Sequence, residues 1–450
     1  MPSVKTTRVR WYLVFWLFVL SAVSYLDRVN ISIAGGTIAE AYQLTNVQLG
    51  KVFSAMLVGY ALFQTVGGRL ADRFGARRVL TFGVLWWGIF TAVTALVPAY
   101  IRGALYAFVA VRFLLGAGEA VIYPAANQFI ACWIPFRERG IANGWIFAGV
   151  GAGAGLTPLL ITYFMTRYGW RSSFWVCAVI GSFAGAIWFL AARDTPAEHK
   201  LVSSSELAEI QSGLSLEPRR QPGSRQSRML LPWRSVISSK EVLALTISYF
   251  CYGYVAWIFF SWFFIYLSQV RGLNLKASAF YSMLPFIAMS LGCLLGGTIN
   301  DRLTRSCGPR VGRCGVAAVA VVLAGIFIAS GAHAESARVA SIILAGGAGA
   351  LYISQSSFWS VTADIAGASS GSVSGFMNMG NQIGAAITVY LTPWIAARFG
   401  WTASFLVASV LCLVGASSWL LVDPTKTLVL EVRDVVDRGD LADLALKPTE

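Results

Sequence analysis

Four ionisable side chains lie well inside the apolar stretches of this sequence: Asp27, Arg28, Arg112 and Glu119. If those stretches cross a lipid bilayer, each charge costs at least ~2.5–3.5 kcal/mol at the bilayer centre, which makes each residue a functional candidate. A carboxylate in a medium of low dielectric constant binds a proton more readily, and a nearby guanidinium opposes that shift. An arginine also offers a planar fork that matches a carboxylate ligand. The four residues therefore indicate proton binding by the acids and anion binding by an arginine.

Spacing decides which of these residues can act together. Arg112 and Glu119 are two helical turns apart and share one face, which Tyr123 extends. Asp27 and Arg28 are neighbours separated by about 100° around a helix axis, so they can face different partners. An alternative is a neutral buried network that only joins two helices. That alternative is disfavoured because a buried ion pair at best breaks even against apolar packing.

The C-terminal part of the chain has no ionisable side chain inside its apolar stretches, but it has polar ones at helical spacing. As a set, these amides and hydroxyls would match the hydroxyls of a polyhydroxy acid, although serine and asparagine also join helices by hydrogen bonds. An aromatic acid would instead need an apolar slot, which Trp257, Phe260 and Trp359 could form. The polar set is Ser374, Asn378, Asn381 and Gln382 in one stretch, with Gln355, Ser356, Ser357, Trp359 and Ser360 in the stretch before it.

The composition shows what kind of scaffold positions these residues. Hydrophobic residues make up 56% of the 450 residues and charged residues only 12%, about half the ~25% of a soluble domain. Such a chain cannot cover a water-facing surface, so it is predicted to be an integral membrane protein. This excludes a secreted enzyme, a nucleic-acid-binding protein and a disordered scaffold, even though the net charge is +14.

Twelve stretches are long and apolar enough to cross a membrane as helices, which takes roughly 20 residues each. A polar segment, 193–241, separates region 1–192 from region 242–422, and a tail follows at 423–450. The predicted fold is an all-α membrane protein with two six-helix bundles. The predicted spans are 11–33, 52–71, 79–101, 103–126, 141–165, 173–192, 242–267, 278–299, 314–332, 339–359, 372–397 and 402–422.

Lysine and arginine are distributed unequally between the two sides of these spans. The side that holds both termini carries about three times as many as the other side. Because basic residues concentrate on the cytoplasmic side of membrane proteins, both termini are predicted to be cytoplasmic. The loop after the tenth span departs locally from this pattern, since it has Asp364 and no basic residue.

The two halves repeat each other in the same orientation. Residues 167–170 and 398–401 match at a shift of 231 residues, and a second pair of windows matches at a shift of 229. Parallel repeats of six helices place the binding site between them near the bilayer midplane, with alternating access by rocking. The second pair consists of Gly67, Gly68, Asp72 and Arg73 in one half and Gly296, Gly297, Asp301 and Arg302 in the other.

The loop GRLADRFGARR at 68–78 resembles the signature loop of the major facilitator superfamily, residue for residue. The second copy departs from the pattern at Thr304, where glycine is usual. A basic turn that obeys the positive-inside rule would have a similar composition. The resemblance implies a transporter whose gating loops include Gly68, Asp72 and Arg73 in one half and Asp301 and Arg302 in the other.

Two further segments narrow this resemblance. YLDRVN at 25–30, and RFLLGAGEA at 112–120 with the RERG loop at 137–140, are similar to the anion:cation symporter branch. That branch includes carriers of galactonate, glucarate, hexuronates and phthalate. The resemblance extends over about residues 11–422 and implies proton-driven uptake of an organic anion through a bacterial inner membrane.

The same resemblance assigns roles position by position. Asp27 and Glu119 become the proton-coupling acids, and Arg112 becomes a charge partner within their network. Arg28 becomes the ligand of the substrate carboxylate. The expected substrate-binding set is Arg28, Tyr25, Tyr60, Asn378, Asn381, Ser357 and Trp359.

We expect the substrate to be a sugar acid, either an aldonate, an aldarate or a hexuronate, because four polar residues share one helix face. An aromatic acid of the phthalate or hydroxyphenylacetate type is the alternative. A drug exporter fits poorly with two arginines, and a non-transporting sensor is expected to carry a regulatory domain. The expected partners are the anion, protons and the bilayer. We expect a monomer that is not an enzyme, with no metal, no cofactor and no nucleic acid.

Overall fold

The computed structural model describes residues 7–44, 46–98, 103–215, 231–263 and 266–428, so part of the central segment and most of the predicted tail lie outside the described residues. The described residues form helices and contain no strand. The helices of the first half are α1 (Val9–Tyr42), α2 (Asn46–Phe74), α3 (Ala76–Leu96), α4 (Ala104–Glu119), α5 (Ile122–Trp133), η1 (Phe136–Glu138), α6 (Arg139–Tyr168), α7 (Trp170–Ala191), η2 (Pro196–Glu198), α8 (Ser204–Ser215) and α9 (Trp233–Ser238). Those of the second half are α10 (Lys240–Ser261), η3 (Tyr266–Val270), α12 (Leu275–Cys307), η4 (Arg310–Gly315), α13 (Val316–His333), α14 (Ala337–Ile353), α15 (Gln355–Ala366), η5 (Gly367–Ser369), α16 (Ser370–Phe399), α17 (Trp401–Ser418) and η6 (Trp419–Leu421).

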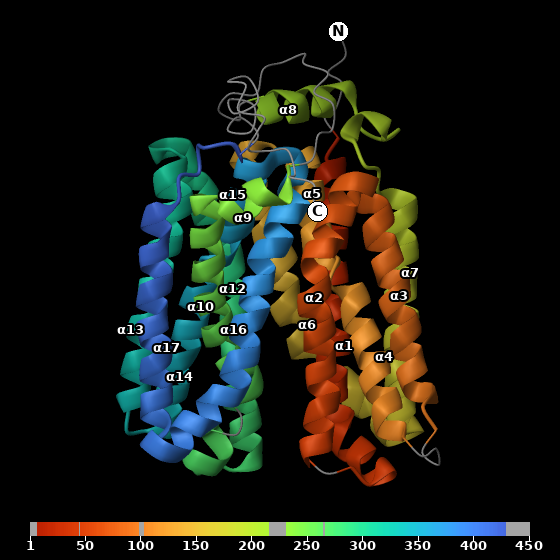
Figure 1. The fold of residues 1–450 in the computed structure, drawn as a ribbon, viewed down its shortest axis with the longest axis vertical. Coiled ribbons are helices and arrows are strands. Elements are labelled where there is room, and N and C mark those ends of the chain that lie inside the picture. Colours follow the sequence, from red (N-terminus) through yellow and green to blue (C-terminus); the bar gives the residue numbers. More distant parts are fainter. Residues whose placement is uncertain (1–6, 45, 99–102, 216–230, 264–265, 429–450) are drawn as a thin grey trace, which may run out of the picture.

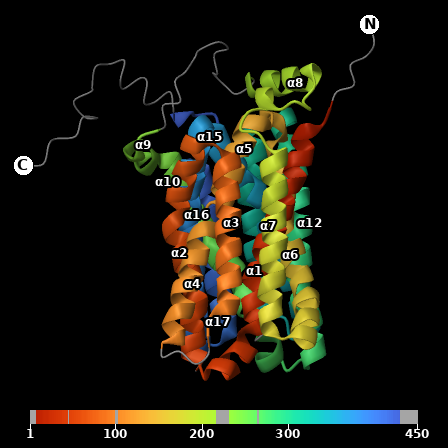
Figure 2. The ribbon, with the colours of Figure 1, turned by 90° about the vertical axis from the view of Figure 1, so that its right-hand side faces the viewer.

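The long helices lie in two bundles that stand side by side with their axes roughly aligned (Figures 1 and 2). Within the described residues, ten helical stretches are long and apolar enough to cross a membrane. One of them, 337–399, makes two crossings, and α6 also runs between the same two ends (Figure 1). The predicted fold of twelve spanning helices in two bundles is therefore confirmed.

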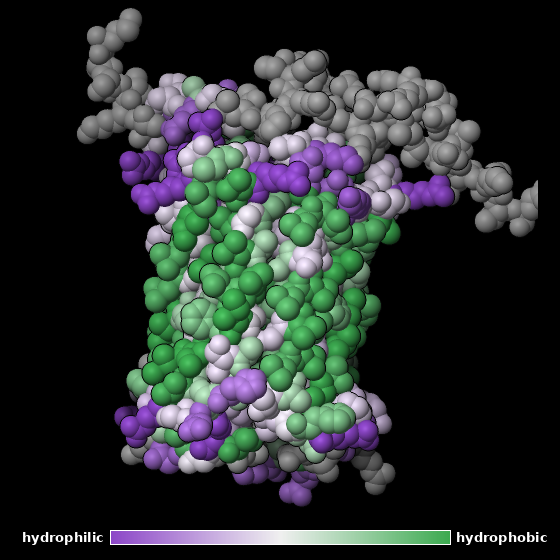
Figure 3. All heavy atoms as spheres, turned by 90° about the vertical axis from the view of Figure 1, so that its left-hand side faces the viewer, coloured by the Kyte–Doolittle hydropathy of each residue, from purple (hydrophilic) through white to green (hydrophobic). Residues whose placement is uncertain are grey.

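The outer surface of the bundles is apolar. Figure 3 shows a hydrophobic belt between two hydrophilic ends on one face of the molecule. Large apolar side chains of α7, such as Phe183 and Leu190, are also exposed. Spanning elements are helices because a helix satisfies its own backbone hydrogen bonds where no water is present. The belt marks the surface that contacts lipid.

Several helices end some residues away from the predicted boundaries (α1, for example, runs to Tyr42), and two of the predicted spans are interrupted. The fourth span was predicted as one helix over 103–126, but α4 ends at Glu119 and α5 continues to Trp133. Pro124 has no N–H to donate to the carbonyl four residues earlier, which explains the interruption there. The tenth span is interrupted at Ser354, whose hydroxyl donates to the Leu351 carbonyl at 2.6 Å and competes with the helical pattern.

One end of the molecule, here called the basic end, carries Arg73, Arg77, Arg302 and Arg305 and is covered by α8 (Figure 1). There, the buried carboxylate of Glu206 on α8 caps the first turn of α1. It accepts hydrogen bonds from the backbone N–H groups of Val9 and Arg10, each at 3.1 Å. Backbone donors in the first turn of a helix lack partners within the helix, so α8 completes α1 from outside.

A second acid of α8 pairs with the same segment. Arg10 donates to Glu209 at 2.6 Å. This hydrogen bond and the positive charge of Arg10 hold the pKa of Glu209 below its ordinary value. The central segment is thus fixed to the first bundle by polar contacts at the basic end.

Candidate functional site

A small cavity lies between the two bundles, where the internal repeat predicts the binding site. Helices α1, α2, α5 and α6 line one side, and α10, α14, α15 and α16 line the other. The lining residues are Tyr25, Arg28, Tyr60, Tyr123, Phe147 and Val150 from the first half, and Tyr249, Tyr252, Ala256, Trp257, Phe260, Tyr352, Gln355, Trp359, Asn378, Asn381 and Gln382 from the second.

Arg28 is the one basic side chain among the described residues that line this cavity. Its guanidinium carbon lies 4.2 Å from the ring centroid of Tyr60 and 4.9 Å from that of Tyr25, which are cation–π distances. Its Nε donates to Glu119 Oε1 at 3.2 Å. Its Nη1 and Nη2 atoms are buried and have no hydrogen-bond partner among the described residues. These two nitrogens are the groups that an anion in the cavity can engage.

Glu119 connects Arg28 to α4. Its side chain is fully buried, and its Oε1 accepts hydrogen bonds from Arg28 and from the Ser24 hydroxyl. Its Oε2 has no hydrogen-bond partner among the described residues. The carboxylate therefore touches the cavity's arginine without lining the cavity, and a proton on it would weaken its hold on Arg28.

Asp27 faces away from its neighbour Arg28, as the helical geometry allowed. It is 2% exposed, does not line the cavity, and accepts a hydrogen bond from Thr91 Oγ1 of α3 at 3.3 Å. Arg112, also buried, lies within electrostatic range of both Asp27 and Glu119. The four predicted membrane charges thus form one network, in which Arg28 is the member that reaches the cavity.

Amide side chains form a row on the second half of the cavity wall. Asn378 donates to Gln64 Oε1 of α2 at 2.8 Å, and Asn381 donates to Asn378 Oδ1 at 3.3 Å. The side-chain oxygens of Asn381 and Gln382 have no hydrogen-bond partner among the described residues. Gln355 donates to the Tyr249 hydroxyl at 2.8 Å. The row thus makes a contact between the two halves, and it also has side-chain oxygens that a ligand in the cavity could bind.

Aromatic rings supply most of the remaining wall. Phe147 lies 4.9 Å from Tyr123 and 5.0 Å from Trp359, measured between ring centroids. Phe260 lies 5.9 Å from Tyr25, so this pair closes part of the gap between the halves. The predicted aromatic candidates, Trp257 included, therefore line the same cavity as Asn378 and Asn381. In the sequence analysis, the aromatic residues and the amides were alternatives that indicated different classes of substrate.

Ser357 lies elsewhere. It is fully buried and accepts a hydrogen bond from Asn300 at 2.7 Å, in the layer between the cavity and the basic end. It is not among the lining residues, whereas Trp359, two positions further, is. The interruption at Ser354 sets the rotation of α15, and this rotation could not be read from residue spacing.

The first of the two predicted gating loops contacts the second half at the start of α16. Asp72 accepts hydrogen bonds from the backbone N–H groups of Gly371 at 2.9 Å and Ser372 at 2.7 Å. Gly68 lies so close that a Cβ on it would stand 2.0 Å from the Gly371 carbonyl oxygen. Arg73 is exposed, and its guanidinium carbon lies 5.4 Å from the ring centroid of Phe74. Asp72 and Gly68 thus make the contact, and Arg73 flanks it.

The second gating loop makes the equivalent contact in the opposite direction. Asp301 accepts hydrogen bonds from the backbone N–H groups of Gly140 at 2.9 Å and Ile141 at 2.6 Å, at the start of α6. A Cβ on Gly297 would stand 2.5 Å from the Gly140 carbonyl oxygen. Arg302, like its counterpart, is exposed. The repeat seen in the sequence is therefore a repeat of contacts as well.

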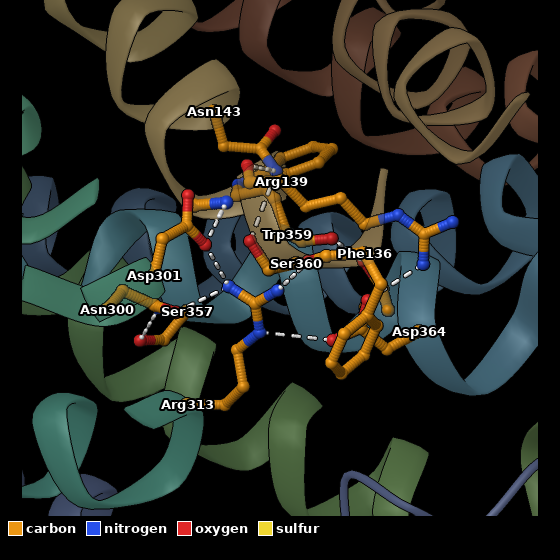
Figure 4. Close-up of polar contacts among 12 residues, drawn as sticks. Phe136, Arg139, Asn143, Asn300, Asp301, Arg313, Ser357, Trp359, Ser360 and Asp364 are labelled. Carbon is orange, nitrogen blue, oxygen red and sulfur yellow. Dashed lines mark hydrogen bonds and ion pairs between the residues drawn. The ribbon is translucent and has the colours of Figure 1, made fainter. Parts of the chain in front are cut away.

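A buried charge cluster at the basic end was not predicted from the sequence (Figure 4). Asp364 accepts from Arg139 of the first half at 2.8 Å and from Arg313 of the second half at 3.1 Å. Arg313 also donates to Asp301 at 2.9 Å and to the Phe136 carbonyl at 2.6 Å. The one indication in the sequence was the loop that has Asp364 and no basic residue. The structure pairs Asp364 with Arg139 and Arg313, which come from other parts of the chain.

These contacts define the state of the molecule. The hydrogen bonds named above that join the two halves lie at the level of the cavity or between the cavity and the basic end. Besides the gating contacts, Asn127 donates to Thr362 at 3.0 Å and Asn143 to Ser360 at 3.3 Å. The two halves are thus joined at the basic end.

Comparisons with known proteins agree with this architecture. The family described as Major Facilitator Superfamily matches residues 17–389 and 360–435. A probable sulfoacetate transporter of Cupriavidus necator is 32% identical over 90% of this chain and 92% of its own length. A probable galactarate/D-glucarate transporter of Bacillus subtilis is 29% identical over 68% of this chain and 67% of its own. The solved structure of the proton:xylose symporter XylE superposes with a TM-score of 0.72 at 15% identity, covering 93% of this chain and 97% of that one.

Proposed function

The chain belongs to the major facilitator superfamily and is a membrane transporter of organic anions, and from this premise we propose that it is a proton-coupled symporter. Its favoured substrate is a sugar acid. The proposed location is a bacterial inner membrane, with the basic end and both termini in the cytoplasm. In that orientation, the described state is closed toward the cytoplasm.

The observation that carries this proposal is the shared use of Arg28. Its Nε is held by Glu119, while Nη1 and Nη2 have no hydrogen-bond partner among the described residues. A substrate carboxylate would take the free side of the guanidinium, and it would compete electrostatically with Glu119. Protonation of Glu119 removes that competition, so proton binding and anion binding favour each other.

Asp27 and Arg112 form the second part of the proposed coupling. Asp27 lies on the far side of α1 from the cavity and near Arg112, so its protonation changes the charge balance of the network without touching the substrate. The net charge of the four-residue network is zero when both acids are ionised, and it becomes positive when a proton binds to either acid. The positive state attracts the anion, and the neutral state releases it.

The amide row supports a sugar acid. Each buried hydroxyl of a ligand that stays unpaired costs about 1–3 kcal/mol, and Asn381, Gln382 and Gln355 can pair with such hydroxyls. The second candidate is an aromatic acid, because Trp257, Phe260, Trp359 and further rings line the same cavity. Rings serve either ligand, since the apolar face of a sugar also stacks on them.

The test is uptake into vesicles that contain the purified protein. We expect uptake of an aldonate or hexuronate to rise as the external pH falls and to collapse when a protonophore is added. A panel of aromatic acids run in parallel decides between the two substrate classes. Uptake that ignores both pH and protonophore would refute proton coupling and leave a facilitator of organic anions.

A further inference from the structure

The number of positive charges at the cavity limits the charge of the substrate. Among the described lining residues, Arg28 is the one cation. The other arginine inside a span, Arg112, does not line the cavity and lies near Asp27 and Glu119. Neither histidine of the sequence, His199 nor His333, is in a position to add a charge there.

The wall opposite Arg28 is polar but neutral. It presents the amides of Gln355, Asn378, Asn381 and Gln382 together with tyrosine hydroxyls such as that of Tyr252. An amide has both a donor and an acceptor, so it pairs with a neutral hydroxyl in either orientation. None of these groups can cancel a full negative charge, and an unpaired buried charge is strongly unfavourable.

Proton counting leads to the same limit. When Asp27 and Glu119 are ionised, the four charges of the network sum to zero. A monoanion that enters with one proton on Glu119 keeps the sum at zero, with the new charge directly on Arg28. A dianion needs a second proton, and the remaining acid, Asp27, is not among the residues that line the cavity. A proton on Asp27 therefore cannot neutralise the second charged group of the ligand by direct contact.

We infer that this transporter selects organic anions that carry a single negative charge and rejects the dianion of the same carbon skeleton. The inference rests on the proposed function, in which Arg28 holds the substrate carboxylate. It divides the sugar acids, because aldonates and hexuronates carry one carboxylate whereas aldarates carry two.

The experiment measures equilibrium binding to the purified full-length protein by calorimetry, at a pH near 7 where the ligands are fully ionised. D-gluconate and D-glucarate form the first matched pair, since they differ in one terminal group. Benzoate and phthalate form a second pair for the aromatic alternative. In whichever pair binds, we expect the monoanion to bind at least about 100-fold more tightly, which corresponds to about 2.8 kcal/mol. The monoamide of glucarate, again a monoanion, should regain most of the loss.

A variant reverses the selection. Gln382 is 5% exposed and its Oε1 has no hydrogen-bond partner among the described residues, so Gln382→Lys places a cation on the wall opposite Arg28, where the second carboxylate of a dianion would pair with it. We expect it to raise the affinity for the dianion at least tenfold. Gln382→Met, of similar length and neutral, is the matched control and should not raise it.

The outcomes separate this inference from the proposed function. If the dianion of a pair binds as tightly as the monoanion in the wild-type protein, charge selection is refuted and anion transport stands. If no member of either pair binds, the proposed substrate classes and the inference fall together. The wild-type comparison decides the question even if a variant fails to fold.

Discussion

The two halves of this transporter have the same fold and make equivalent loop contacts at the basic end, yet their cavity walls differ in chemistry. The first half contributes Arg28 and, behind it, Glu119, Asp27 and Arg112. The second half contributes neutral amides and rings. The repeat is therefore kept in the contacts between the halves at the basic end, and it is lost at the cavity wall. In the proposed function, the first half binds the charge of the ligand and the second half binds its neutral remainder.

Removing the charge from the first half should have the largest effect. Losing one partner of a buried charge pair costs about 2–5 kcal/mol, so Arg28→Ala should weaken substrate binding by roughly 30-fold to several thousand-fold. Arg28→Lys should also bind poorly, because an ammonium cannot reproduce the bidentate fork. Calorimetric titration measures both. The exposed Arg398→Lys, at the other end of the molecule, is the control, and unchanged affinity in Arg28→Ala would contradict the assignment.

Neutralising the acids of the first half should uncouple transport from protons. We expect Glu119→Gln or Asp27→Asn to abolish accumulation against a gradient while substrate exchange across the membrane continues. Uptake driven by a pH gradient is compared with counterflow in the same vesicles. Glu335→Gln removes an exposed acid and should behave as the wild type. Concentrative uptake that survives in the double variant would remove both acids from the mechanism.

A change in the neutral half should alter specificity more than coupling. Asn381→Ala removes one amide from the row and should weaken a sugar acid by about tenfold, which is ~1.4 kcal/mol. A simple aromatic carboxylate should be barely affected, and the pH dependence of uptake should stay the same. Trp257→Ala should have the opposite effect, weakening the aromatic carboxylate more than the sugar acid. Equal losses for both ligands would mean that the row supports the fold and does not read hydroxyls.

Charges outside the cavity should matter least. The pKa of Glu209 is lowered by Arg10, so this carboxylate stabilises the fold above the ordinary glutamate pKa of about 4.3. The contribution is lost as the pH falls through the lowered value. Glu209→Gln should therefore reduce the Tm by a small amount at neutral pH and by nothing in strong acid. A thermal-unfolding series over pH checks this, and a Tm difference that grows with acidity would contradict it.

The sequence predicted those site residues whose charge is unusual for their position, because charged side chains are rare inside membrane spans. Asp27, Arg28 and Glu119 stand out because a charge inside an apolar span is costly. Of the three, Arg28 lines the cavity, and Glu119 is paired with it from behind. Arg139 was part of the RERG loop but had no role assigned to it, and Arg313 did not stand out, because arginines near helix ends at the basic side are ordinary. Their buried cluster with Asp364 exists only once the two halves meet.

Helix rotation was the other limit of sequence reasoning. The twelve spans followed from hydropathy, but the interruption at Ser354 changes which residues of α15 face the cavity. Ser357 was thereby directed to Asn300, and Gln355 was directed to the ligand side. Spacing rules hold along an uninterrupted helix, and both interrupted spans carry site residues.

The glycines at the basic end give the conformational cycle a simple steric control. Closure needs Gly68 against the Gly371 carbonyl and Gly297 against the Gly140 carbonyl, at distances that leave no room for a methyl group. An alanine at either position would act as a wedge that holds the basic end apart while leaving the cavity's chemistry intact. A single carbon atom at position 68 or 297 could thus arrest the transporter in its opposite state, which would make that state accessible to inhibitors, antibodies and structure determination.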